Sequence, residues 1–178
     1  YGFNVGQDDK DVNTYIPGFS QGGTSLPDRD YYLKMDARSK MIRDAYVKYI
    51  RDMFKLVGDD EATAQKKAEA ILSLETGLAT AQKSRVEMRD PIKTYNKYSI
   101  ADFTKLTPGF DWKELMSEMK VNDADSILVD NPAFFQTTAS LFAAVPLDTW
   151  KAYLQWAVIK STAGFLSTNF VNGNLEFS

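Results

Sequence analysis

The side chains that could do chemistry are restricted in kind, because none of the 178 residues is a histidine or a cysteine. Without cysteine there is no disulfide, no thiolate nucleophile and no Cys-type zinc or iron–sulfur site. Without histidine the chain lacks the commonest general base, the commonest metal ligand and every Ser-His or Cys-His catalytic pair. The remaining carboxylates, lysines, tyrosines and serines form no recognisable catalytic signature. We therefore assign no catalytic and no metal-binding residue, and we leave the substrate-binding residues open.

Glu75 is the carboxylate that most invites a functional interpretation. It lies three to four residues from Ile71 and Leu78 on the apolar side of a helical pattern, so we expect it to be buried. A catalytic acid would need a second convergent carboxylate or base, which we cannot identify. A structural anchor is the favoured interpretation, held by an arginine, a tyrosine or a backbone donor, because a buried carboxylate must be paired or hydrogen-bonded. The candidate arginines are Arg29, Arg85 and Arg89.

Charge gives little sign of a metal, nucleic acid or lipid ligand. The acidic run at residues 8–11 lacks the alternating ligand spacing and the distal glutamate of an EF-hand, so we interpret it as a polar turn. The net charge of −3 does not favour nucleic acid or anionic lipid. Residues 28–55 mix basic, acidic and tyrosine side chains, but the alternating signs are typical of a solvated helix surface. No apolar run reaches the roughly 18–20 residues that span a bilayer.

Composition places the chain among ordinary globular proteins, with 44% hydrophobic and 25% charged residues. The length favours one domain over residues 1–178, and a two-lobed helical body is the alternative. The sequence opens on Tyr1 without the charged and apolar regions of a signal peptide. We therefore expect a piece of a longer protein, here called the parent protein, or a processed product.

The elements that must position these side chains are mostly helical. The longest helical pattern runs from Asp60, a candidate N-cap, to Arg85, and the other elements are expected to pack around it. A second amphipathic helix begins after Asp36 and ends before Gly58, which suits a C-terminal glycine. Together with a helical turn after Pro27, these patterns predict a helical hairpin over residues 27–88.

The flanking regions complete a mainly α fold, a helical bundle with a small N-terminal β-hairpin at residues 1–23. Pro17 would confine its strand to an edge of the sheet or to an irregular position. Further helices are expected over residues 99–178, the last of them ended by Gly173, and residues 92–98 are expected to be irregular. Residues 127–129 form a short apolar run that is a candidate strand. Further N-cap signals are found at Ser99, Asp111 and Asn131.

Four separate stretches carry a family resemblance. Residues 25–33 read SLPDRDYYL and resemble the GLPDRDYYL segment of the neprilysin and endothelin-converting-enzyme family of zinc metallopeptidases. Three more stretches follow in the family's order, so the resemblance covers essentially the whole chain, including DDK at residues 8–10. It is closest to the bacterial oligopeptidase branch, which also fits the absence of cysteine, since animal members are disulfide-bonded. The three stretches are LETGLA at 74–79 with RDP at 89–91, YNKY at 95–98 with PGFDW at 108–112, and PLDTWKAYL at 146–154.

The resemblance implies a function for the parent protein more than for this chain. The family's zinc-binding H-E-x-x-H helix, its downstream glutamate ligand and its substrate-gripping motif all lie towards the C-terminus. This chain resembles the amino-terminal, largely helical region, part of which faces the catalytic domain across an enclosed cavity. It therefore implies no catalytic residue here, zinc in the parent enzyme, and the C-terminal catalytic domain and peptide substrates as partners.

Three classes of function remain open. The leading one is a non-catalytic helical segment of a zinc endopeptidase that walls the substrate cavity and limits access to small peptides. The alternative is a free-standing helical protein-interaction module with an exposed aromatic face around Trp150 and Trp156. An enzyme that uses carboxylates alone is the third. We also expect an exposed apolar face on the helix from Trp150 to Phe165 or on the terminal segment, through which the chain could dimerise. The expected location is extracytoplasmic, either periplasmic or surface-anchored, and the alternative is cytoplasmic.

Overall fold

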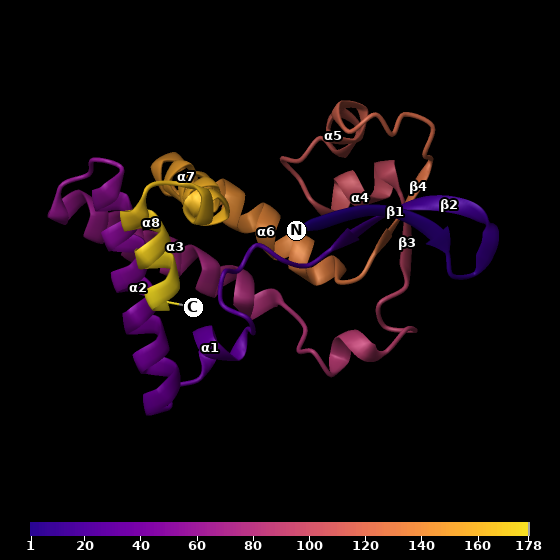
Figure 1. The fold of residues 1–178 in the computed structure, drawn as a ribbon. Helices are drawn as coiled ribbons and strands as arrows, with labels where there is room; N and C mark the ends of the chain where they lie inside the picture. The colour runs from indigo at the N-terminus through magenta and orange to yellow at the C-terminus, as the bar shows by residue number, and fades with distance from the viewer. Residues whose placement is uncertain (178) are drawn as a thin grey trace. The chain divides into compact units, whose positions relative to one another are not determined.

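Two compact units make up the chain. The computed structural model describes residues 1–177 (Figure 1). Unit 1 comprises Tyr1–Ser25 and Thr80–Ala144, and unit 2 comprises Leu26–Ala79 and Val145–Ser178. The chain therefore passes from one unit to the other three times. A single domain over residues 1–178 stays a prediction.

Unit 1 is built on a mixed sheet of four strands in the order β1-β2-β4-β3. β1 and β2 are the expected hairpin, but β2 also pairs in parallel with β4, and β3 pairs with β4 in antiparallel fashion. The prediction that the sheet is no more than a hairpin was therefore wrong. The prediction of irregular backbone throughout residues 92–98 was also wrong, because β3 begins within this range. The candidate strand at 127–129 is confirmed. The strands are β1 Gly2–Asp8, β2 Asp11–Ser20, β3 Asn96–Ser99 and β4 Ser126–Val129.

β2 pairs on both sides only near its end, at Gly18 and Phe19, so Pro17 lies where β2 is still an edge of the sheet, as the sequence predicted. The proline pairs with Val5 of β1, and the pairing with β4 is confined to Gly18 and Phe19. Because β4 contacts β2 only beyond the proline, the missing N–H of Pro17 removes no hydrogen bond between these two strands. The short parallel contact thus leaves the proline at an edge position, although β2 is internal at its end.

The helices of unit 1 begin at the side chains expected to cap them. Ser99 accepts a hydrogen bond from the N–H of Asp102, and Asp111 accepts one from the N–H of Glu114. The side-chain oxygen of Asn131 accepts one from the N–H of Phe134 at 3.3 Å, just before Pro132 starts its helix. The helical elements are η1 Glu87–Arg89, α4 Ile100–Leu106, α5 Trp112–Glu118 and α6 Pro132–Ala144.

Aromatic rings form the core of unit 1. Phe19 of β2 lies 4.9 Å from the ring of Trp112, and Phe103 lies 4.8 Å from the same ring, measured between centroids. Phe135 of α6 meets Trp112 edge-on at 5.8 Å. All four side chains are at most 2% exposed. Edge-to-face and tilted contacts of this kind stabilise a core beyond the area that they bury.

Unit 2 is helical, with two long helices joined by a tight turn. Asp36 accepts a hydrogen bond from the N–H of Ser39, and Asp60 accepts one from the N–H of Thr63 at 2.8 Å, so both expected caps are confirmed. Gly58 has φ +108°, the left-handed conformation that ends a helix at little cost only for glycine. The elements are α1 Asp30–Leu33, α2 Ala37–Leu56, α3 Glu61–Ala81, α7 Leu147–Thr162, η2 Ala163–Phe165 and α8 Thr168–Phe177.

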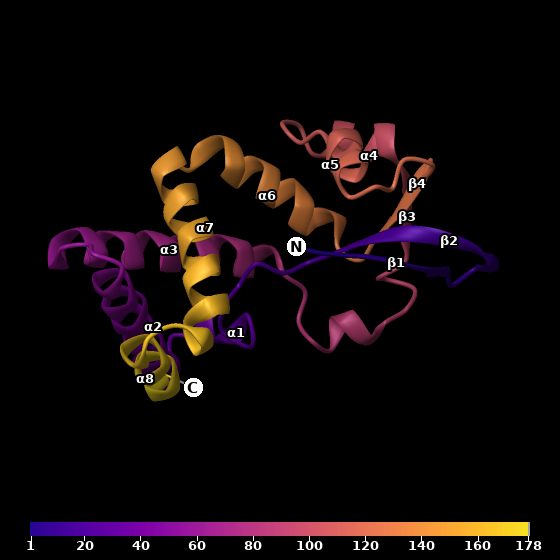
Figure 2. The ribbon, with the colours of Figure 1, turned by 45° about the horizontal axis from the view of Figure 1, so that its top comes forward.

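The last helix, α8, continues past the glycine that was expected to end it. Gly173 lies inside α8 and against α2, where an added Cβ would stand 3.3 Å from the sulfur of Met53. The glycine therefore serves close packing and not helix termination. α8 and α2 lie side by side (Figure 2), with the Tyr49 and Phe177 rings stacked at 4.7 Å and the Tyr49 hydroxyl donating to Asn174 at 2.8 Å.

Candidate functional site

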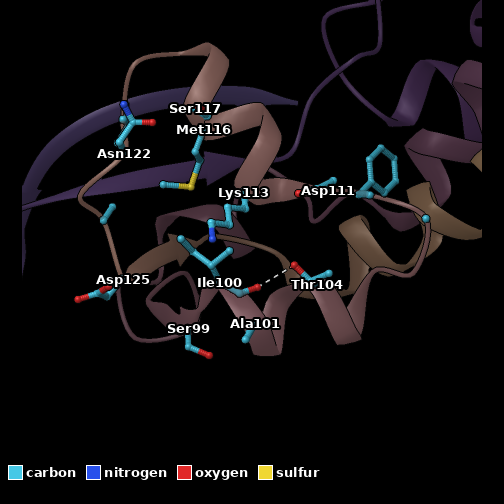
Figure 3. A pocket seen from close by; sticks show the side chains of 14 residues that line it. Ser99, Ile100, Ala101, Thr104, Asp111, Lys113, Met116, Ser117, Asn122 and Asp125 are labelled. Atoms are coloured by element: carbon cyan, nitrogen blue, oxygen red, sulfur yellow. Dashed lines mark hydrogen bonds between the residues drawn. The ribbon is translucent and has the colours of Figure 1, made fainter.

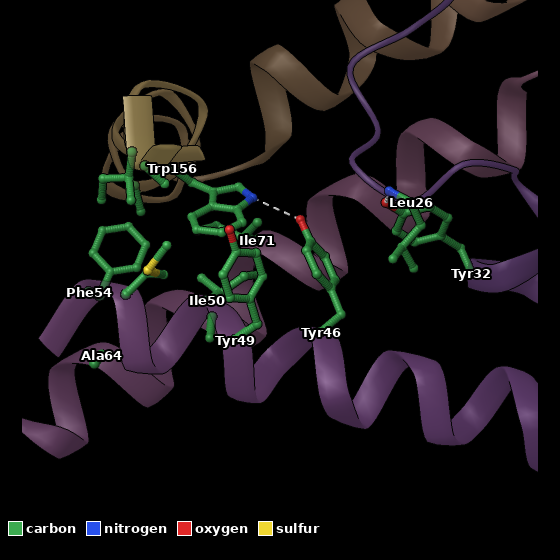
Figure 4. Close-up of a cluster of buried hydrophobic side chains, with 14 of the residues drawn as sticks. Leu26, Tyr32, Tyr46, Tyr49, Ile50, Phe54, Ala64, Ile71 and Trp156 are labelled. Atoms are coloured by element: carbon green, nitrogen blue, oxygen red, sulfur yellow. Dashed lines mark hydrogen bonds between the residues drawn. The ribbon is translucent and has the colours of Figure 1, made fainter. Parts of the chain in front are cut away.

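Glu75 lies in the core of unit 2, as expected, and is 0% exposed. Its Oε2 accepts hydrogen bonds from the hydroxyl of Tyr32 at 2.7 Å and from the hydroxyl of Tyr46 at 3.0 Å. Each hydroxyl in turn accepts one: Tyr46 from the indole N–H of Trp156 at 2.8 Å, and Tyr32 from the backbone N–H of Leu26 at 2.8 Å (Figure 4). The donors are thus tyrosines, one of the three kinds of partner that were expected for Glu75.

This arrangement suits a structural anchor. A catalytic carboxyl must reach substrate, and Glu75 is enclosed by apolar helices. Each tyrosine hydroxyl uses its single proton on the carboxylate and its lone pairs on a second donor, so the network is directional. Burial, followed by the negative charge of Glu75, raises the pKa of Tyr153 to about 12, so this phenol stays protonated at neutral pH.

A second polar cluster, in unit 1, joins the end of β2, the segment after α3 and the start of α6. Both carboxylate oxygens of Asp130 accept from the backbone N–H of Gln21, at 3.0 and 3.3 Å. The ammonium of Lys83 donates to the backbone carbonyl of Asp130 at 2.9 Å, and the amide of Asn131 donates to the side chain of Gln21 at 2.8 Å. Burial raises the pKa of Asp130, and the hydrogen bond from the Gln21 backbone, followed by the charge of Lys83, opposes this rise only in part.

A perturbed carboxyl beside a lysine is a common feature of active sites, but the contacts here point elsewhere. Gln21, Lys83 and Asp130 contact one another's backbone groups, which fixes three segments that are far apart in the sequence. The cluster therefore satisfies the backbone where the chain leaves secondary structure. The cluster could not be predicted from the sequence, because no local pattern at Gln21 or Lys83 indicates a partner more than 40 residues away.

Asp8 is the member of the acidic run that the fold buries, with 1% exposure. It accepts from the ammonium of Lys97 and the hydroxyl of Tyr95, both at 2.8 Å, and from the backbone N–H of Lys10 at 3.0 Å. The hydrogen bond from Lys97, followed by that from the Lys10 backbone, lowers the pKa of Asp8 to about 2. These contacts tie the turn of the β1–β2 hairpin to β3, and they leave Asp8 engaged in an ion pair.

An open cleft of about 1080 Å³ lies in unit 1 between α4, α5 and the loop that follows α5 (Figure 3). Several of its polar groups serve the helices themselves: Ser99 and Asp111 are N-caps, and Thr104 donates to the carbonyl of Ile100 at 2.8 Å. Apolar side chains such as Met116 complete the lining. The cleft has the chemistry to receive a side chain of a peptide or of a neighbouring polypeptide, and its helix-capping groups are not poised for bond cleavage.

The carboxylates do not converge on a metal. Within residues 1–177, no three Asp or Glu side chains lie close enough to hold an ion. No helix in the same described part is long and apolar enough to cross a membrane.

The prediction of an exposed aromatic face around Trp150 and Trp156 was wrong for Trp156. Trp156 is 1% exposed and lies in the core, with its ring 5.1 Å from that of Tyr49. There its indole N–H donates to the hydroxyl of Tyr46 at 2.8 Å. The exposed side of α7 carries aliphatic residues instead, with Leu154 61% and Val158 62% exposed.

Comparison with known proteins supports the resemblance seen in the sequence. The structure of the zinc metalloprotease Zmp1 of Mycobacterium tuberculosis in its open state matches with a TM-score of 0.92 and 33% identity, over 99% of this chain and 27% of that chain. Endothelin-converting enzyme 1 of Rattus norvegicus is 26% identical over 178 residues, which is 97% of this chain and 23% of that protein. PepO of Lactobacillus rhamnosis, at 17% identity and a TM-score of 0.79, shares the fold over 99% of this chain and 28% of that chain.

The chain thus spans about a quarter of the length of these relatives. Two of the three come from bacteria, which agrees with the bacterial branch expected from the sequence. The amino-terminal family model, described as peptidase family M13, matches residues 1–178. The chain therefore belongs to peptidase family M13 and corresponds to the amino-terminal region of its neprilysin-like enzymes.

Proposed function

We propose that this chain is a non-catalytic segment of a neprilysin-like zinc metalloendopeptidase, where it walls the substrate cavity and limits access to small peptides. The observation that carries the proposal is the match to a zinc metalloprotease at a TM-score of 0.92 over 99% of this chain and only 27% of the other. The matched region accounts for the whole chain and leaves most of such an enzyme outside it. The C-terminal catalytic domain of the parent protein is the proposed partner.

Zinc and the bond-breaking step are assigned to that remaining part. Peptidase zinc needs about three protein ligands and one open position for water, with imidazole as the usual ligand. This chain has no histidine, and the carboxylates of residues 1–177 are too dispersed to replace it. The residues here do not fit a catalytic zinc, so no catalytic step is derived through them.

A wall acts by shape, which requires a rigid body. In unit 2 rigidity comes from the hydrogen bonds that converge on Glu75, and in unit 1 from the interlocked rings around Trp112. Selection by such a wall depends on the size of the substrate and not on its sequence, since a folded protein cannot enter an enclosed cavity. The proposed substrates are therefore short, flexible peptides.

The proposed location is extracytoplasmic, periplasmic or on the bacterial surface, with the cytoplasm as the alternative. This proposal rests on the family resemblance alone. Fractionation of the source cells, with detection of the parent protein in each fraction, tests it directly. Recovery in the cytoplasmic fraction together with a cytoplasmic marker would decide for the alternative.

The test of the function compares this chain with the full-length parent protein on a quenched peptide, with added zinc and with a chelator. We expect chelator-sensitive cleavage by the parent and none by the chain. A second substrate carries the same cleavage sequence in a loop of a stably folded protein, and we expect the parent to spare it. Turnover by the chain itself, or a parent without metal-dependent activity, would refute the assignment. Equal cleavage of both substrates would refute the proposal that the chain limits access to the substrate cavity.

A further inference from the structure

α7 has two apolar sides. Its inner side is in the core of unit 2, with Ala152, Trp156 and Ile159 between 1% and 7% exposed. Its outer side carries four large apolar residues at helical spacing, three on α7 and one in the following η2 turn. We call this set the outer α7 stripe: Leu147 67% exposed, Leu154 61%, Val158 62% and Phe165 91%.

A solvated helix of the same unit looks different. On α2 the outer side carries ion pairs four residues apart, Lys40 with Asp44 at 2.7 Å and Lys48 with Asp52 at 2.8 Å. The exposed side of α7 carries one longer ion pair, Asp148 with Lys151 at 3.7 Å, beside leucine and valine, and Phe165 follows in η2. Helices that are apolar on both sides are usually covered on both sides, and contiguous exposed apolar residues mark interaction surfaces. The outer α7 stripe therefore has the composition of a contact surface.

The relatives indicate what covers it. This chain matches 27% of the Zmp1 chain and 23% of endothelin-converting enzyme 1, so about three quarters of each lies outside the matched segment. A single row of four side chains is narrow for an association between separate molecules, which typically buries about 1,200 Å² or more. It suffices within one polypeptide, because tethering replaces the entropic cost of association with a high effective concentration.

We propose that the outer α7 stripe is the docking surface for an apolar face of the parent polypeptide outside residues 1–178. The proposal rests on the proposed function insofar as the chain is part of a longer M13 protein. It does not depend on catalysis. It adds to the proposed function a defined contact, centred on Leu154 and Val158, by which the helical segment is held against the rest of the enzyme.

The absence of cysteine from this chain makes thiol labelling a direct test. Leu154→Cys and Val158→Cys each place one thiol on the stripe, and because both positions are exposed in unit 2 the substitutions leave its core intact. Asp148→Cys is the matched control, on the same helix with a side chain 96% exposed. The rate of reaction with a small maleimide is measured in the full-length parent, with cysteines elsewhere in it replaced, and is divided by the rate for the same variant unfolded in guanidinium.

Both stripe variants are expected to react at least roughly tenfold more slowly than Asp148→Cys, since a covered thiol reacts only when the contact opens. Equal normalised rates for stripe and control would overturn the proposal. So would protection that disappears on dilution, because a second copy would then be the cover. Chelator-sensitive peptide cleavage by the same preparations is scored separately: protection without cleavage supports the docking surface and refutes the proposed activity, and cleavage without protection does the reverse.

Discussion

The two units of this chain build their cores in different ways. Unit 1 packs aromatic rings against a sheet, with the indole N–H of Trp112 donating to the hydroxyl of Thr107 at 2.7 Å as a buried polar contact. Unit 2 packs helices around a carboxylate, Glu75, which depends on hydroxyl donors from Tyr32 and Tyr46. The first core is specified by shape and the second by hydrogen bonds as well.

The difference has an energetic meaning. An aromatic core loses stability in proportion to the volume that is removed, because the surrounding rings cannot collapse into the space. A core with a buried charge loses stability when a single oxygen is deleted and the volume hardly changes, because the charge is left short of donors. Removal of a large side chain should therefore destabilise unit 1 more, and deletion of a hydroxyl at nearly constant volume should destabilise unit 2 more.

The largest effect is expected from Phe135→Ala in unit 1. Phe135 is 1% exposed and contacts the rings of Phe19, Phe103 and Trp112, so its removal should lower the free energy of unfolding by about 3–5 kcal/mol. Phe142→Ala, on the same helix at 50% exposure, is the control and should cost clearly less. Urea unfolding followed by tryptophan fluorescence measures both. Equal losses would show that ring packing does not specify this core.

Tyr46→Phe in unit 2 is expected to come next, at about 2 kcal/mol, since it deletes a hydrogen bond to a buried charge and the acceptor for Trp156. The ring volume is kept, so packing alone predicts almost no change. Tyr15→Phe, whose side chain is 71% exposed, is the matched control and should be neutral. The same unfolding experiment applies. A neutral Tyr46→Phe would mean that Glu75 does not depend on this donor.

A smaller effect, about 1–2 kcal/mol, is expected from Thr107→Val in unit 1. The threonine hydroxyl donates to the carbonyl of Phe103 at 2.6 Å and accepts from Trp112, so the substitution strands a buried indole N–H. Thr104→Val removes a hydroxyl that donates to a helix carbonyl in the same way, without the indole contact. The difference between the two variants, measured by thermal and urea unfolding, isolates the tryptophan bond. No difference would contradict its role.

The last prediction concerns acid. The pKa of Asp8 is lowered to about 2, below the value of about 3.9 of an unfolded chain, so its contribution to stability is present above pH 4 and is lost as the pH falls towards 2. Lys97→Met removes the largest cause, so the pKa should rise towards its ordinary value, which makes the stability lost in acid smaller and confines that loss to a narrower pH range just below 4. Lys10→Met keeps the backbone donor and should shift the pKa less. NMR titration of the carboxyl gives both values, and identical shifts would refute the assignment to Lys97.

Local features of this fold could be predicted from the sequence, and distant ones could not. The caps at Asp36, Asp60 and Ser99 involve residues three positions apart, so their patterns are visible in the sequence itself. β4 was visible as a short apolar run, but β3, with four residues, was not, and the partners of both strands depend on pairing with distant segments. Propensity alone does not supply that information.

The buried site shows the same limit. Hydrophobic periodicity was enough to place Glu75 inside, and electrostatics required that it have donors. Which donors it has could not be read from the sequence, because Tyr32 and Tyr46 are 43 and 29 residues away. An exposed apolar face on the helix from Trp150 to Phe165 was expected from the sequence, but not that Leu154 and Val158 form it, since α7 is apolar on both sides and its sequence does not distinguish them.

The threefold passage of the chain between the units has a consequence for how the protein is made. The side chains of Gln21 and Asn131, which join the end of β2 to the start of α6 in unit 1, are 110 residues apart, and unit 2 also combines two segments that are separated by residues 80–144. At a synthesis rate of about 5–20 residues per second, the first strands wait many seconds on the ribosome before β4 exists to receive them. Contacts of such long sequence separation slow folding, so neither unit can be completed while the chain is still short, and the nascent hairpin is the segment most in need of protection by chaperones.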